Sequence, residues 1–157
     1  MFGVSGPAGR AYVRLYRSTN QTLSHGTTTP IQFTSATGNL KFLGRTVTTG
    51  TYDSVFAPWT GLYLFVGNAQ FAANSTGSRN LQLAVGGTTP IRYANTEPTP
   101  SASAASFVVL QGAIYLNKGQ FMQFSAQQSS GGDLDLVSSG TTHNYTPFLE
   151  VVYLGDL

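Results

Sequence analysis

Apolar and polar residues alternate with a period of two along most of this 157-residue chain. Successive side chains of a β-strand point to opposite faces, so this alternation predicts strands that are buried on one face. It occurs in seven segments: AYVRLYR (11–17), PIQFT (30–34), GLYLFVGNAQF (61–71), RNLQLAV (79–85), SFVVLQGAIYL (106–116), QFMQFSAQ (120–127) and PFLEVVYL (147–154). Turn signals such as NSTGS and NKG separate these segments. We therefore predict an all-β sandwich or barrel.

The segment 61–71 departs from simple alternation, because both of its faces are apolar in the first half. Tyr63 and Phe65 point to one face, and Leu64 and Val66 point to the other. An antiparallel strand with one solvated face should carry polar residues on that face. Two interpretations follow: the strand lies in a crowded core, or a second subunit covers its other face.

Three stretches between the predicted strands are expected to be loops: residues 35–54, 94–106 and 128–144. The second of them, ANTEPTPSASAAS, is rich in proline and of low complexity, which is typical of a long surface loop. Because binding residues are often carried by loops on a rigid scaffold, we expect these stretches to determine specificity.

The amino-acid composition argues against several classes of function. Charged residues are 9% of the chain, against about 25% in an average domain. The eight Lys and Arg residues are scattered, which argues against a nucleic-acid surface. The chain has no cysteine, so disulfides and cysteine-based metal sites are excluded. It has no apolar run of membrane-spanning length and no signal-peptide core, so we expect no membrane insertion.

The first ten residues contain GVSGPAGR, with glycine at positions 3, 6 and 9. Glycine at every third position is what a collagen triple helix requires, because only glycine fits at its crowded axis. We therefore divide the chain into residues 1–10, a collagen-like stalk remnant or a flexible leader, and residues 11–157, the globular domain.

Three motifs resemble the jelly-roll heads of the complement q-subcomponent and tumour necrosis factor superfamily. They are G-x-Y-x-F at Gly61, Tyr63 and Phe65; an apolar strand followed by Leu116, Lys118 and Gly119, with Gln120 in place of the usual aspartate; and the last strand, NYTPFLEVVYL (144–154). In its local residue strings, the sequence is most similar to the cysteine-free versions of these heads in bacteriophage structural proteins and bacterial surface fibres. The resemblance implies a jelly-roll β-sandwich that assembles as a homotrimer behind a fibrous stalk.

The resemblance also implies which residues meet in the trimer. The face opposite Tyr63 and Phe65 assigns Leu64, Val66 and Asn68 to the interface. Motif alignment adds Val109 and Tyr145, and the same alternation in the segment 120–127 adds Phe121. These six residues are the predicted trimer interface.

Catalytic chemistry is sparse in the sequence. His25 and His143 are the only histidines, the side chains that serve most readily as bases near neutral pH. His143 lies near Ser138, Ser139 and the pair Asp133 and Asp135 in sequence, but no nucleophile-elbow glycine pattern accompanies them. We predict no catalytic residue and no enzymatic activity.

Two further features have both a structural and a functional interpretation. Asp133 and Asp135 lie in GGDLDL, either as solvated loop residues or as calcium ligands whose number a threefold axis would complete. Trp59 lies in FAPWTG, either as a packing residue or as a platform on which a sugar could stack. We expect no cofactor to be required for folding, with calcium as the alternative.

We therefore expect a non-enzymatic trimeric head of a phage virion or surface fibre, which acts in structure or decoration and in binding a receptor or host surface. Its partners would be its own copies, a capsid or fibre protein, and a cell-surface receptor or glycan. It would face outward from a virion or cell surface and be made without its own signal peptide. The alternatives are a secreted complement-like or cytokine-like recognition head and a small carbohydrate-binding β-sandwich.

Overall fold

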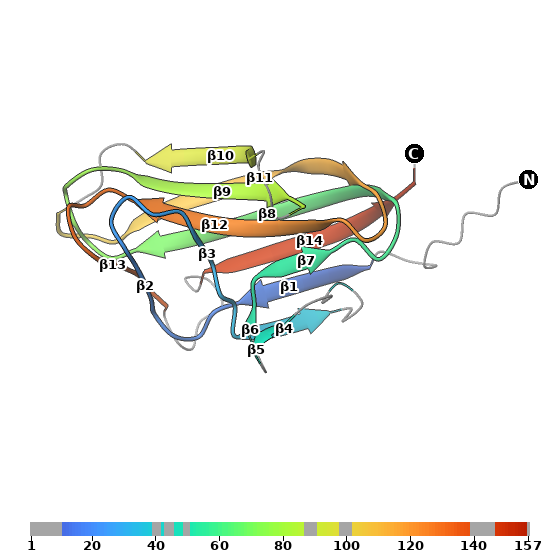
Figure 1. Ribbon diagram of the computed structural model, residues 1–157, viewed down its shortest axis with the longest axis horizontal. Helices are drawn as coiled ribbons and strands as arrows, with labels where there is room; N and C mark the ends of the chain where they lie inside the picture. The colour runs from blue at the N-terminus through green and yellow to red at the C-terminus, as the bar shows by residue number, and fades with distance from the viewer. Residues whose placement is uncertain are drawn as a thin grey trace, which may run out of the picture.

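The computed structural model describes residues 11–38, 42, 46–48, 51–86, 91–97, 102–138 and 147–156. These residues form two antiparallel sheets and one short hairpin, and they include no α-helix. No helix that could cross a membrane occurs in this part of the chain. The long strands of both sheets run along the long axis of the sandwich (Figure 1). The predicted all-β jelly-roll sandwich is confirmed.

The large sheet has seven strands. They are β1 (Tyr12–Tyr16), β2 (Gln21–Leu23), β4 (Ser35–Gly38), β8 (Gly61–Phe71), β11 (Ser106–Leu116), β13 (Leu134–Leu136) and β14 (Phe148–Gly155). Their order is β2-β13-β8-β14-β1-β4, and β11 pairs with β8 along its whole length. β8 therefore lies inside the sheet, between β11 on one side and β14 and β13 on the other.

The small sheet has five strands. They are β3 (Thr29–Pro30), β7 (Ser54–Phe56), β9 (Arg79–Val85), β10 (Ile91–Glu97) and β12 (Phe121–Gln128). Their order is β10-β9-β12-β3, with β7 also paired to β12. The hairpin consists of β5 (Thr46–Thr48) and β6 (Thr51–Tyr52).

The predicted loops contain strands that the alternation did not reveal. Residues 94–97 belong to β10 and do not form a surface loop. β4, β5, β6 and β13 also lie within expected loops. β4, β5, β6 and β13 are only two to four residues long, which is too short for a repeating apolar pattern to identify them. Conversely, the segment 30–34 is mostly not a strand: Pro30 ends β3, and Phe33 makes an isolated bridge to Tyr52.

The core lies between the two sheets and is built from alternate residues of each strand. The large sheet contributes Val13, Leu15, Tyr63, Phe65, Leu149 and Val151, and the small sheet contributes Leu81, Leu83, Met122 and Phe124, all buried. Gly67 faces this core at a point of close approach. A Cβ atom at Gly67 would lie 2.5 Å from Cε1 of Phe124 and 2.7 Å from the carbonyl oxygen of Phe148.

β1 begins and β14 ends at the same end of the sandwich (Figure 1), with Tyr12 opposite Val152. The stalk or leader predicted for residues 1–10 lies outside the described residues. The division into residues 1–10 and 11–157 stays a prediction.

Candidate functional site

The outward side of β1, β14, β8 and β11 is apolar, and we call it the apolar face. It carries every large hydrophobic side chain that is substantially exposed in the described part of the chain. These side chains are Tyr12 (47%), Leu64 (43%), Phe107 (44%), Val109 (47%), Tyr115 (48%) and Leu154 (46%). Apolar side chains scattered singly over a surface are ordinary, whereas a contiguous patch indicates an interaction site.

The strand register arranges the apolar face in three rows that cross the sheet from β1 through β14 and β8 to β11. The first row is Tyr12, Val152, Leu64 and Ala113; the second is Arg14, Glu150, Val66 and Gln111; and the third is Tyr16, Phe148, Asn68 and Val109. Cross-strand neighbours in such rows lie close enough for their side chains to touch. The first and third rows are largely apolar, and the middle row is mixed.

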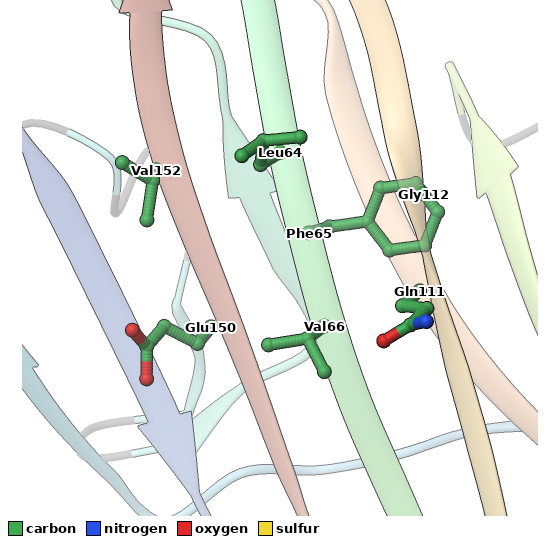
Figure 2. A pocket seen from close by; sticks show the side chains of 7 residues that line it. All are labelled: Leu64, Phe65, Val66, Gln111, Gly112, Glu150 and Val152. Carbon is green, nitrogen blue, oxygen red and sulfur yellow. The ribbon is translucent and has the colours of Figure 1, made fainter.

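A shallow hollow of about 390 Å³ lies at the centre of the apolar face. Its lining is Leu64, Phe65, Val66, Gln111, Gly112, Glu150 and Val152. Figure 2 shows Leu64 and Val66 on β8, with Val152 and Glu150 of β14 on one side and Gln111 of β11 on the other. The lining is mostly apolar, with one carboxylate and one amide at its edge.

Arg14 and Glu150 are the only charged residues among the outward positions described on these four strands. They are directly opposite each other in the pairing of β1 with β14. The guanidinium carbon of Arg14 lies 4.6 Å from the ring centroid of Phe148, a cation–π distance.

The structure places four of the six predicted interface residues together. Leu64, Val66, Asn68 and Val109 all lie on the apolar face, in adjoining positions of β8 and β11. Their role in a trimer stays a prediction. Tyr145 lies outside the described residues.

Phe121 does not lie with the other predicted interface residues. It is on β12 of the small sheet, where its ring centroid lies 5.1 Å from that of Phe56. The core-facing residues of β12 are Met122 and Phe124, so Phe121 points outward on the opposite side of the sandwich. Alternation identified its outward direction but could not tell which of the two sheets carries it.

Four further residues of the apolar face, which were not among the predicted interface residues, are Tyr12, Phe107, Tyr115 and Leu154. A signal for them was present, because each lies in a predicted strand at a position that alternates with core residues. Recognising the face required the strand order, which places β1, β14, β8 and β11 side by side.

Trp59 packs against the end of the core. Its ring centroid lies 5.4 Å from that of Tyr153 and 6.0 Å from that of Phe42. The hydroxyl of Tyr63 donates to the carbonyl oxygen of Trp59 at 2.5 Å. Burial raises the pKa of Tyr63 to about 12. These contacts agree with the packing interpretation of Trp59, and its role as a ligand platform stays a prediction.

Three of the residues considered for catalysis or calcium binding have hydrogen-bonding partners within the fold. Asp135 accepts a hydrogen bond from Oγ1 of Thr22 at 2.7 Å, and the Oγ of Ser138 donates to the carbonyl oxygen of Arg17 at 2.9 Å. Nδ1 of His25 accepts from the backbone N–H of Gly131 at 2.9 Å. Within the described ranges, no three His, Asp or Glu side chains gather as metal ligands would. Asp133 is exposed, and His143 lies outside the described residues.

The comparisons with known proteins identify the fold. No family model matches the sequence, and no curated protein matches it. Among solved structures, murine APRIL is similar with a TM-score of 0.64 and 15% identity, over 93% of this chain and 100% of that one. Eiger TNF from S. frugiperda is similar with a TM-score of 0.60 and 15% identity, over 94% and 93%. The chain therefore has the jelly-roll fold of tumour-necrosis-factor-like proteins.

Proposed function

We propose that this protein is a non-enzymatic head domain that assembles as a homotrimer through its apolar face. The observation that carries the proposal is the gathering of six exposed hydrophobic side chains on one side of one sheet. Complete burial of such a side chain contributes roughly 1.5–3 kcal/mol. Because these side chains are about half exposed in the protomer, assembly would supply about half of that for each one, and a threefold assembly repeats each gain three times.

The outward side of the small sheet differs sharply from the apolar face. Its outward positions on β9 and β12 are mostly polar, with Asn80, Gln82, Gln123, Ser125 and Gln127 beside Ala84 and Phe121. Gln82 and Ser125 are themselves buried, and no large hydrophobic side chain described on this side is substantially exposed. The contrast supports assembly through the large sheet, as the resemblance to the trimeric jelly-roll heads implies.

More specifically, we propose that the domain is the head of a virion or surface fibre. It would face outward and bind a capsid or fibre protein, a receptor or a glycan. The cysteine-free sequence and the glycine spacing of GVSGPAGR support this form. A cytokine-like recognition head is the second candidate, and the likeness of the fold to murine APRIL and Eiger TNF favours it. The genes that flank this one would discriminate the two, because capsid and tail genes would support the fibre head.

Sedimentation velocity or multi-angle light scattering at micromolar concentration tests the assembly. We expect one species with three times the mass of the chain. A well-folded monomer at that concentration would contradict the proposal, because an uncovered face of this kind should not persist in solution.

A further inference from the structure

The middle row of the apolar face has polar groups at both of its ends. Arg14 on β1 and Glu150 on β14 form one end, and Gln111 on β11 forms the other. Val66 lies between Glu150 and Gln111. No other row on this face holds a charged residue in the described strands.

Assembly would remove these groups from water. Glu150 and Gln111 both line the central hollow, which a covering subunit would close. A charged group that loses water must find hydrogen-bonding partners, since burying it without them is strongly unfavourable. A neighbour that offers only apolar surface would leave this requirement unmet.

The two ends of the row have complementary chemistry. A guanidinium only donates hydrogen bonds and a carboxylate only accepts them, whereas an amide does both. Gln111 is exposed and lies on the side of the face farthest from Arg14. The guanidinium carbon of Arg14 lies over the ring of Phe148, next to Glu150 in the strand register.

The geometry of a ring brings unlike sides together. In a cyclic trimer each contact joins two different surfaces of the subunit. The polar ends of the middle row lie on two such surfaces, the β11 side and the β1–β14 side. A rotation about the threefold axis does not change the position of a residue along that axis. If the strands run parallel to the axis, each row crosses the sheet at one level, and the middle rows of the three protomers lie at the same level.

We propose that Gln111 of each protomer hydrogen-bonds to the Arg14–Glu150 pair of its neighbour, and that this contact fixes the register of the trimer and selects a second copy over other apolar surfaces. The inference rests on the proposed homotrimer. Polar contacts in an apolar interface characteristically act by penalising partners that cannot satisfy them.

Disulfide trapping tests the contact directly, because the chain has no cysteine of its own. In the double variant Gln111→Cys/Arg14→Cys, the two cysteines of one chain are separated by three strand spacings, about 14 Å. A disulfide requires Cα atoms within about 7 Å, so the pair can only join different chains. We expect mild oxidation to give a covalent trimer on a denaturing gel, while each single-cysteine variant stays monomeric there. The matched control Gln111→Cys/Asn80→Cys places one cysteine on the small sheet and should not cross-link.

A second variant avoids any effect of Arg14 on folding. Gln111→Leu changes one exposed side chain and should raise the midpoint concentration of trimer dissociation by about tenfold. A native trimer that forms no cross-link between positions 111 and 14, or in which Gln111→Cys alone cross-links, would overturn the inference and leave the proposed function standing. A monomeric wild type would overturn the proposed function itself.

Discussion

Val66→Asp tests the proposed interface at the centre of the apolar face. Val66 lies between Glu150 and Gln111 in the middle row and lines the hollow. It points away from the core, so the fold of a single protomer does not depend on it. The substitution therefore acts on assembly much more than on folding.

The structure allows the cost to be worked out. The introduced carboxylate would stand directly opposite Glu150, with the two side chains about 5 Å apart. At that distance two carboxylates repel by about 1 kcal/mol in water and by about 3 kcal/mol at the effective dielectric constant of a partly buried site. Losing the burial of the half-exposed valine adds about 1 kcal/mol. Because Glu150 and position 66 belong to the same protomer, about 1 kcal/mol of this repulsion exists before assembly, and assembly adds about 2 kcal/mol. Repeated in three protomers together with the lost burial, the penalty on assembly is about 9 kcal/mol, more than half of the roughly 16 kcal/mol that two micromolar association steps supply.

Light scattering and thermal unfolding measure the outcome. We expect the wild type to be trimeric and Val66→Asp to lose the trimer and to appear as aggregate or unfolded chain. Ala84→Asp is the matched control, because Ala84 is also half-buried and outward but on β9 of the small sheet; it should stay trimeric. The reasoning fails if Val66→Asp remains trimeric with an unchanged melting temperature.

Four other predictions concern the folded protomer. Gly67→Ala should destabilise the fold by about 1–3 kcal/mol in denaturant titration, because its Cβ would lie 2.5 Å from a core ring. Arg79→Met should cost about 2–4 kcal/mol in the same assay, since the buried guanidinium donates to three loop carbonyl groups. Because the pKa of Tyr63 is raised to about 12 in the folded state, its contribution to stability is complete below pH 10 and is lost as the pH rises toward 12; Tyr63→Phe should flatten that part of the profile of melting temperature against pH. Chelation should leave the melting temperature unchanged, and a large drop would instead identify Asp133 and Asp135 as calcium ligands.

The long strands could be predicted from the sequence because, in each of them, apolar core residues recur regularly at every second position. β8 and β11 have the bounds that the pattern indicated, 61–71 and 106–116. β2 and β13 could not be found in this way. They are three residues long, and their pairing of Leu134 with Leu23 depends on contacts more than a hundred residues apart in sequence. Tertiary context, more than local preference, decides such short strands.

The site could be predicted only in part, for a related reason. The apolar outward residues of β8 were recognisable because a solvated strand should not carry them. Their neighbours on β1 and β14 became part of one face only through the strand order. The burial of Arg79 could not be predicted from the sequence, because a lone arginine at the start of an apolar strand resembles a surface residue. In the structure it is completely buried against the loop of residues 74–78.

The positions of the few charged residues strengthen the case for an ordered interface. Arg17 and Arg79 are buried, and backbone carbonyl groups satisfy much of their hydrogen-bonding capacity. A chain with only eight Lys and Arg and six Asp and Glu residues thus places two of them inside the protomer. Arg14 and Glu150 are also unusually placed for charged residues, because they lie directly opposite each other within an otherwise apolar face. Two apolar residues there would bury more easily and would bind any apolar surface. A charged pair at that position makes sense if the surface that covers it carries matching polar groups, and a second copy of the chain brings Gln111 on the opposite side of the same row.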